Sequence, residues 1–132
     1  MVIDTSALVA ILLSEPEAPR FAAAIESAGS RLLSAANLLE ASMVIETRKG
    51  AAGARELDLF LYRAGVEILP VDQDQAEIAR IAWRWFGKGR HPAGLNYGDC
   101  FAYALAKLSQ EPLLFKGVDF SQTDLAGVMT GD

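Results

Sequence analysis

Short apolar runs alternate with longer amphipathic segments along the chain, and this alternation predicts its secondary structure. The short runs predict β-strands over Val2–Asp4, Arg31–Ala35, Gly65–Val71, Pro112–Phe115 and Gly127–Met129. The segments between them have helical periodicity and are long enough for right-handed crossovers. The pattern therefore predicts an α/β fold around a central, mainly parallel sheet of four to five strands.

Proline and glycine mark the expected ends of the helices. Pro16 and Pro19 lie around the start of one helix. Four glycines are expected to stop helices or to form turns: Gly29, Gly50, Gly53 and Gly65. The segment from Gly87 to Gly94, GKGRHPAG, is the clear long loop, and its basic residues and His91 could face a ligand.

Acidic residues follow several of the predicted strands, at the edge where parallel α/β sheets bind ligands. Asp4 ends the first strand, Glu40 follows the second and Asp119 follows the fourth. Asp99 begins the helix that precedes the fourth strand. Because these strand ends and helix starts meet at one cleft in a parallel sheet, we expect the four carboxylates to converge.

Each carboxylate also has a structural explanation. Asp99 falls at the third helical position if Asn96 is the N-cap, and Glu40 stands three residues after Asn37, so both could complete capping boxes. Asp4 could cap the helix that follows it. Function is favoured at Glu40, because its segment LLEASMVI is apolar on nearly every side and buried glutamate needs compensation.

Repulsion limits what such a cleft can hold. Two carboxylates 4 Å apart repel by roughly 4 kcal/mol at an effective dielectric constant near 20. No arginine or lysine adjoins Asp4, Glu40 or Asp99 in the sequence, so a shared divalent cation is the simplest compensation. Ligands that are all oxygen favour Mg²⁺ or Mn²⁺ over zinc, and such sites serve phosphate-ester chemistry.

Composition narrows the class of protein further. The 132 residues are 52% hydrophobic, which fits one domain over residues 1–132. A lone cysteine, Cys100, excludes an internal disulfide, and no membrane span or secretion signal is present, so we expect a cytoplasmic protein. The net charge of −5 argues against non-specific nucleic-acid binding. Four acids at a metal site would leave 13 acidic against 12 basic residues, so a nucleic-acid substrate stays possible.

Four segments then carry a family resemblance: MVIDTSALVAILLSEPEA, SAANLLEASMVI, LNYGDCFAYALAK and PLLFKGVDFSQTDL. In this order they resemble the PIN-domain ribonucleases, and in particular the VapC toxins of type II toxin–antitoxin modules. The resemblance covers essentially the whole chain. It implies a three-layer α/β/α sandwich with a central, mainly parallel sheet, and an endoribonuclease that depends on Mg²⁺ or Mn²⁺.

The resemblance also assigns the site. It places the family's catalytic acids on Asp4, Glu40, Asp99 and Asp119, with Asp4 and Asp99 as metal ligands. Its supporting hydroxyl falls on Thr5 or Ser6, and Ser6 is favoured.

The end of the chain departs from the family pattern in one respect. Val118 stands where many relatives have a polar residue, often an acid, so Asp124 is expected to replace or supplement Asp119.

At the rim of the proposed site, Arg90 and Lys116 are expected to contact the RNA backbone.

Partners follow from the same resemblance. It implies a cognate VapB-type antitoxin whose C-terminal segment lies in a groove beside the active site, with Leu38–Arg48 and Ala54–Tyr62 as candidate walls. A homodimer is expected, and operator DNA would be bound only through the antitoxin.

Other conspicuous residues receive structural interpretations. Asp72 is expected to cap a helix, and Cys100 to be buried. His91 is expected to be exposed, and Trp83, Trp85 and Phe86 to pack against the core or a dimer partner.

Two other functions remain open from the sequence. A receiver-type phosphoacceptor domain also binds Mg²⁺ in an acidic pocket, but it needs paired acids after the first strand, where this chain has one. A catalytically inactive PIN-like module that binds RNA or protein is the second alternative.

Overall fold

The computed structural model describes residues 1–130, and the strands in this range form one parallel sheet with the order β3-β2-β1-β4. The strands are β1 (Val2–Ile3), β2 (Leu32–Ser34), β3 (Glu67–Leu69) and β4 (Leu113–Leu114). In the register, Val2 lies opposite Leu32 on one side and Leu113 on the other. The predicted parallel α/β fold is confirmed.

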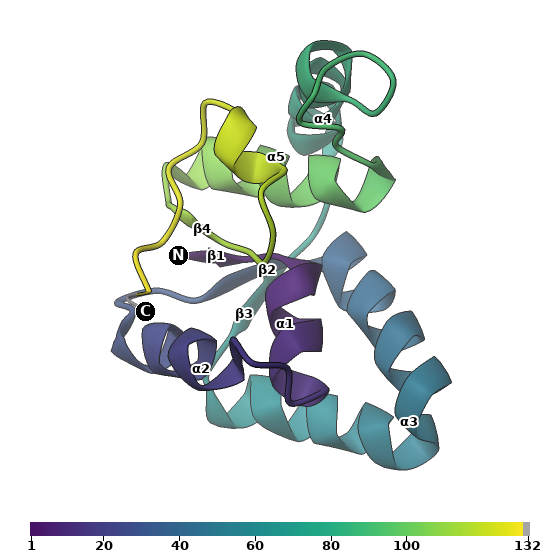
Figure 1. Cartoon of the computed structure of the whole chain (residues 1–132), viewed down its shortest axis with the longest axis vertical. Coiled ribbons are helices and arrows are strands. Elements are labelled where there is room, and N and C mark those ends of the chain that lie inside the picture. Colours follow the sequence, from purple (N-terminus) through teal and green to yellow (C-terminus); the bar gives the residue numbers. More distant parts are fainter. Residues whose placement is uncertain (131–132) are drawn as a thin grey trace.

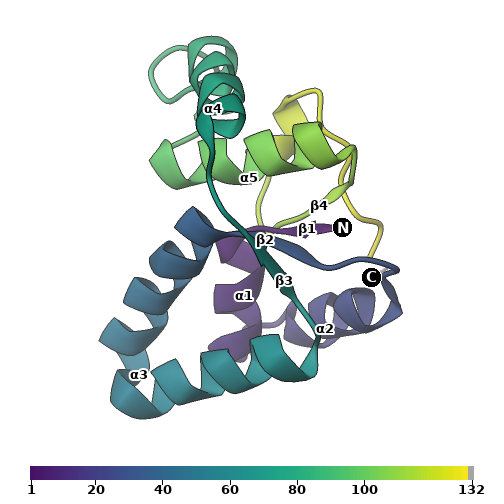
Figure 2. The same cartoon turned by 180° about the vertical axis from the view of Figure 1, so that it is seen from behind.

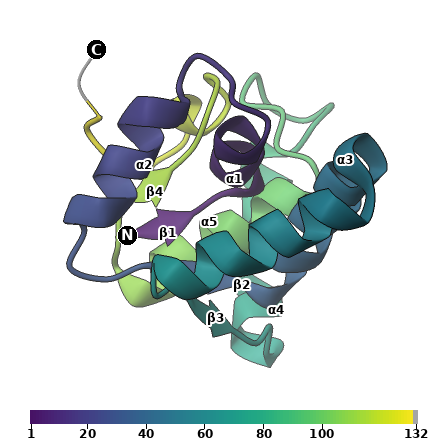
Figure 3. The same cartoon turned by 90° about the horizontal axis from the view of Figure 1, so that it is seen from below.

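Helices cover both faces of the sheet (Figure 1). On one face lie α1 (Thr5–Leu12), α2 (Ala18–Ser27) and α3 (Ala35–Arg63). On the other lies α5 (Tyr97–Ser109), and α4 (Gln73–Phe86) packs on the outside of α5 (Figure 2). Seen from below, α1, α2 and α3 lie in front of the sheet and α5 lies behind it, which is the expected three-layer arrangement (Figure 3).

The central strands are apolar throughout because they are buried from both sides. Val2 joins the core under α4 and α5, whereas the next residue, Ile3, joins the core under α1, α2 and α3. Leu113 and Leu114 divide in the same way between the two cores. This alternation places β1 in the middle of the molecule, with Asp4 immediately beyond its carboxyl end.

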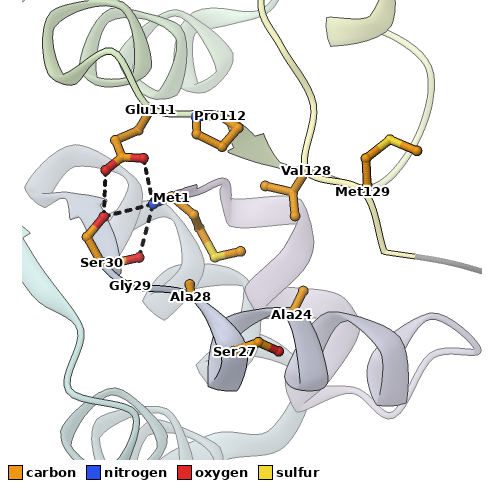
Figure 4. A pocket seen from close by; sticks show the side chains of 10 residues that line it. All are labelled: Met1, Ala24, Ser27, Ala28, Gly29, Ser30, Glu111, Pro112, Val128 and Met129. Carbon is orange, nitrogen blue, oxygen red and sulfur yellow. Dashed lines mark hydrogen bonds and ion pairs between the residues drawn. The ribbon is translucent and has the colours of Figure 1, made fainter.

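The amino end of β1 is also fixed. The amino group of Met1 donates hydrogen bonds to the carbonyl oxygen and Oγ of Ser30, at 3.0 and 2.9 Å, and pairs with Glu111 Oε2 at 3.2 Å (Figure 4). A cavity lined by Ala24, Val128 and Met129 among others lies beside it. The amino end of β1, the strand that leads to Asp4, is therefore held in place.

Two expectations about strands and helices are corrected. The strand expected at Gly127–Met129 is only an isolated parallel bridge between Gly127 and Leu113. Gly50, with φ 64° and ψ −159°, interrupts the helix as expected, so that α3 consists of two helical segments that meet there at a kink. Gly53 forms no turn, because it is buried inside α3 against Ile45.

The other glycine signals are confirmed. Gly65, with φ 64°, follows the end of α3, and Gly29 follows the C-cap of α2.

The 3₁₀ helix η1 (Phe120–Gln122) comes after β4. Within the described part of the chain, no helix is long and apolar enough to span a membrane.

Candidate active site

Asp4 forms the floor of the candidate site. As the N-cap of α1, its Oδ2 accepts hydrogen bonds from the Ser6 backbone N–H at 3.0 Å and from Ser6 Oγ at 2.6 Å. Its Oδ1 is buried and has no hydrogen-bond partner among the described residues. Ser6 Oγ in turn accepts the backbone N–H of Lys116 at 2.9 Å. Capping therefore uses one carboxylate oxygen and leaves the other for a ligand.

The electrostatics of Asp4 confirm that other acids lie nearby. Its pKa is raised to about 7: burial is the main cause, the Ser6 hydrogen bonds oppose it, and the negative charges of Asp99 and Glu40 add to it. With only 3% of Asp4 exposed, water cannot screen this repulsion. The predicted convergence of these carboxylates at one end of the sheet is therefore observed.

Glu40 reaches this cleft from the second turn of α3. Its Oε1 accepts a hydrogen bond from Thr5 Oγ1 at 2.5 Å and one from Asn37 Nδ2 at 3.3 Å. Asn37 is fully buried, and its Nδ2 also donates to the backbone oxygen of Gly98 at 3.0 Å. Asn37 therefore ties α3 to the start of α5. The helix N-cap is Ser34, so Asn37 and Glu40 do not form a capping box.

Asp99 combines capping with a place in the cleft. Its backbone N–H donates to Asn96 Oδ1 at 2.9 Å, and its Oδ2 accepts the Asn96 backbone N–H at 3.0 Å, so the predicted capping box is present. Burial raises the pKa of Asp99, the bond from Asn96 opposes this, and the charges of Glu40 and Asp119 raise it further. Asp99 therefore both completes the capping box of α5 and lies in the acidic cleft.

Asp119 lies at the rim. It precedes η1, makes no side-chain capping bond and is exposed. Its negative charge repels that of Asp99 and contributes to the raised pKa of that carboxyl.

Asp124 is a correction, because its carboxylate is engaged elsewhere. Oδ1 accepts a hydrogen bond from Tyr103 Oη at 2.7 Å, and Oδ2 pairs with Lys107 Nζ at 2.5 Å. The lysine and the tyrosine hold the pKa of Asp124 below its usual value against the effect of burial. Both partners stand on α5 beyond its first turn, so Asp124 fastens the C-terminal segment to that helix rather than supporting the cleft.

The basic residues expected at the RNA are also engaged within the protein. The Arg90 guanidinium lies 4.4 Å from the centre of the Trp83 ring. Lys116 Nζ pairs with Glu15 at 3.1 Å and with Glu17 at 3.2 Å. Among the described residues, neither side chain forms an ion pair with Asp4, Glu40, Asp99 or Asp119.

Among the structural interpretations, Asp72 as the N-cap of α4 and buried Cys100 are confirmed. His91 is only half-buried, because its ring packs edge-on against Phe86 and its Nδ1 accepts the Ala93 N–H at 3.0 Å. Phe86 joins the core as expected, but Trp83 and Trp85 remain 47% and 61% exposed.

The cleft suits a hard cation in its chemistry but is not a finished cage. Its donors are carboxylate and hydroxyl oxygens, and the unpartnered Oδ1 of Asp4 is buried where a cation would compensate it. Within residues 1–130, however, no three His, Cys, Asp or Glu side chains are placed to hold one ion. Among the described residues the acids therefore form no direct three-carboxylate cage, and the expectation that Asp4, Glu40 and Asp99 hold an ion directly or through water stays a prediction. One or two carboxylates are enough for Mg²⁺, which retains several waters.

Two contributors to the site escaped sequence reasoning. The sequence offers Asn37 only as a possible capping partner of Glu40, and the one signal for its role is its place three residues before Glu40 in an apolar helix. The backbone N–H of Lys116, which fixes Ser6, has no sequence signal, because only folding brings β4 beside α1.

Comparison with known proteins now decides the family, because the family model described as "PIN domain" matches residues 1–125. The chain belongs to the PIN-domain family. This PIN domain is 62% identical over 128 residues to "Ribonuclease VapC30" of Mycobacterium tuberculosis, covering 97% of this chain and 98% of that protein. It is 59% identical to "Ribonuclease VapC" of Mycolicibacterium smegmatis, with coverages of 97% and 99%. These identities place the PIN domain among the VapC ribonucleases.

Solved structures share the fold at low sequence identity. "Mycobacterium tuberculosis VapC20 (Rv2549c), Sarcin-Ricin loop cleaving toxin" matches with a TM-score of 0.76 at 19% identity, covering 96% of this PIN domain and 97% of that chain. A "Toxin-antitoxin complex from Klebsiella pneumoniae" matches with a TM-score of 0.73 at 18% identity, with coverages of 99% and 98%. The PIN fold is therefore confirmed.

Proposed function

We propose that this VapC-type endoribonuclease hydrolyses RNA phosphodiester bonds in the cleft of Asp4, Glu40 and Asp99, as the toxin of a VapBC-type module. One observation carries the assignment: a buried carboxylate at a strand end has an unpartnered oxygen, and two further acids raise its pKa. Membership of the VapC ribonucleases supports the reaction class and rules out the receiver-type alternative. The retained acids argue against an inactive module. We treat residues 1–132 as a single PIN domain.

Metal dependence is general among PIN-domain VapC ribonucleases, and we infer Mg²⁺ or Mn²⁺ for this chain. Asp4 and Asp99 would hold the ion, since Asp4 has an unpartnered oxygen and Asp99 lies beside it in the cleft. Such an ion would neutralise charge on the scissile phosphate and would make water a stronger nucleophile. Hydrolysis would then break the bond between phosphorus and the 3′ oxygen and leave 5′-phosphate and 3′-hydroxyl ends.

The protein's own residues orient these acids. Ser6 fixes Oδ2 of Asp4, so the free Oδ1 faces one direction. Thr5 and Asn37 fix Glu40, which we place as a positioning carboxylate that acts through water. Each of the two hydroxyls after Asp4 therefore serves a different acid, whereas the sequence offered Thr5 or Ser6 as a single helper and favoured Ser6. Asp119 completes the rim on the Asp99 side.

We infer a VapB-type antitoxin as the partner. A cavity of about 380 Å³ lies between the starts of α3 and α5, with apolar walls that include Leu39, Met43 and Phe101 and with Glu40 in its lining. Leu39 and Met43 are each 62% exposed and belong to the predicted groove wall Leu38–Arg48. An apolar segment of an antitoxin that lies there would cover the cleft. A homodimer, and operator DNA bound through the antitoxin, complete the proposal.

Incubation of the purified chain with a panel of cellular RNAs tests this function. We expect cleavage with Mg²⁺ or Mn²⁺, none with chelator, products that carry 5′-phosphates, and loss of cleavage when the co-expressed antitoxin is bound. Products with 2′,3′-cyclic phosphates, or cleavage that persists in chelator, would contradict the proposed chemistry.

Gly98→Ala tests how Glu40 is positioned. A β-carbon at this position would collide with both Glu40 carboxylate oxygens, so the substitution displaces Glu40 while sparing every acid. We expect kcat/KM for RNA to fall about 10²-fold, the order of loss that follows a small misplacement of a catalytic group. Gly29→Ala is the matched control, because a β-carbon there meets nothing within 4 Å. Equal activity of the two variants would remove Glu40 from the mechanism.

A further inference from the structure

The residues just before Asp99 form a positive segment in an acidic protein. Between Glu77 and Asp99 the chain has no carboxylate side chain, but it has four cationic ones, Arg80, Arg84, Lys88 and Arg90. The whole chain, by contrast, carries a net charge of −5. This segment comprises most of α4 and the following loop, which pack on α5 (Figures 1 and 2). Positive charge is therefore concentrated beside the proposed active site.

A cavity of about 590 Å³ opens between α4 and α5 in this region. Its walls are mainly apolar and aromatic, and they include Trp83, Leu95, Tyr97 and Phe101. The cations Arg80 and Lys88 also line it. Lys88 forms no ion pair with any residue between 1 and 130, whereas Arg80 pairs at 3.5 Å with exposed Glu77. Aromatic walls with cations among them suit a flat, apolar group attached to an anion.

Two aromatic rings at this cavity, Trp83 and Tyr97, are partly exposed, although one face of Trp83 carries the Arg90 guanidinium. Trp83 is 47% exposed, and the Arg90 guanidinium lies 4.4 Å from its ring centre. Tyr97 is 82% exposed and packs edge-on against Phe101, with ring centres 4.9 Å apart. Unpaired nucleobases stack on such aromatic rings and on arginine planes, and their phosphates attract the neighbouring cations.

The cavity adjoins the acids directly. Asn96 lines it, and the Asn96 backbone N–H donates to Asp99 Oδ2 at 3.0 Å. Tyr97 and Phe101 line both this cavity and the one that contains Glu40. A group in the cavity would therefore lie next to a phosphate at the acidic cleft.

We propose that this α4–α5 cavity takes one unpaired nucleobase of the RNA, next to the scissile phosphate and stacked on Trp83. Lys88 and Arg80 bind the adjoining phosphates. The inference rests on the proposed function and deepens it, because it makes the substrate a single-stranded segment. The positive charge of this segment and its aromatic rings favour RNA over an acidic or apolar protein segment. Of these three, only RNA offers both a flat ring and regularly spaced phosphates.

A cleavage assay with abasic RNA tests the base contact. In a short single-stranded substrate, each position beside the cleaved bond is made abasic in turn. For the wild-type protein, one position should lower kcat/KM about 10-fold or more. Trp83→Ala should lower kcat/KM similarly on intact RNA, and should show no further loss at that position. Trp85→Ala is the matched control, because Trp85 stands on the same helix, is more exposed and lines neither cavity.

Fluorescence separates binding from catalysis. The chain has two tryptophans, so Trp85→Phe leaves Trp83 as the only reporter and Trp83→Phe leaves Trp85. Without metal, a nucleoside 5′-monophosphate should quench Trp83 and not Trp85, and ribose 5-phosphate should quench neither. Quenching of Trp83 in a protein that cleaves no RNA would contradict the proposed function and leave the nucleobase cavity standing.

Three outcomes would overturn the nucleobase cavity. In the first, the abasic substitution lowers kcat/KM of Trp83→Ala by the same factor as it lowers kcat/KM of the wild-type protein, which would mean that the base does not contact Trp83. In the second, Trp83→Ala cleaves RNA normally but no longer binds the antitoxin, which makes the cavity a protein groove. In the third, Trp83→Ala turns a dimer into a monomer in sedimentation, which makes the cavity a contact with a second copy.

Discussion

Asp4→Asn and Asp99→Asn are each expected to lower RNA cleavage by about 10³-fold, because each removes one of the two carboxylates proposed to hold the cation. Loss of metal-assisted charge stabilisation costs several kcal/mol in the transition state, which corresponds to a loss of this order. Asparagine keeps the size of the side chain and an acceptor oxygen, which serves as the N-cap of α1 at position 4 and can still accept the Asn96 N–H at position 99, so α1 and α5 should stay folded. Rates under single-turnover conditions, with circular dichroism of each variant, measure the effect.

Two other aspartates provide the controls for this result. Asp72→Asn changes a capping acid that lies outside the cleft, and we expect unchanged cleavage. Asp124→Asn weakens the contacts with Tyr103 and Lys107, and we expect a small loss of stability with cleavage retained. A loss at Asp124 as large as that at Asp4 would show that our correction is wrong and that Asp124 belongs to the catalytic group.

The second large effect concerns stability and pH in the absence of metal. Folding raises the pKa of Asp4 from 3.8 to about 7, so the folded state holds this proton more tightly than the unfolded chain. The resulting stabilisation is complete below about pH 4 and is lost as the pH rises to about 7. We expect the free energy of unfolding to fall by about 4 kcal/mol from this group across that window. Asp99, whose pKa is also raised, contributes in the same direction.

Asp4→Asn should therefore be more stable than the wild-type protein at pH 8 in chelator. Adding Mg²⁺ should raise the Tm of the wild-type protein and leave that of Asp4→Asn almost unchanged, because binding to the folded state alone stabilises it. Urea titrations from pH 4 to pH 8, with Asp72→Asn as the control, measure both effects. If the free energy of unfolding of the wild-type protein does not decrease from pH 4 to pH 8, the pKa of Asp4 is not raised by folding.

Features that depend on neighbours in sequence could be predicted. The capping box of Asn96 and Asp99 closes within four residues, and Asp72 caps α4 over the same span. The apolar runs at residues 2–3 and 113–114 indicated central strands, since a strand buried on both faces must be apolar at every position. Gly50 was also predictable locally, because its positive φ is incompatible with a continuous helix and divides α3 into two segments.

Features that depend on distant contacts could not be predicted in this way. Asp119 and Asp124 stand five residues apart, and nothing local shows that one borders the cleft while Tyr103 and Lys107 hold the other. Likewise, Thr5 binds Glu40 across 35 positions of the chain, so the division of the two hydroxyls between two acids is invisible in the sequence.

The sequence by itself determined the parallel fold, the family and the acids at the strand ends, because strand periodicity, helix capping and motif spacing are written locally along the chain. Only the tertiary structure decided which oxygens remain free for a ligand. It left Oδ1 of Asp4 without a partner, engaged Glu40 through Thr5 and Asn37, and opened a cavity between α4 and α5. The reason is physical: an oxygen's availability depends on every group packed around it, and packing brings together residues that the sequence keeps far apart.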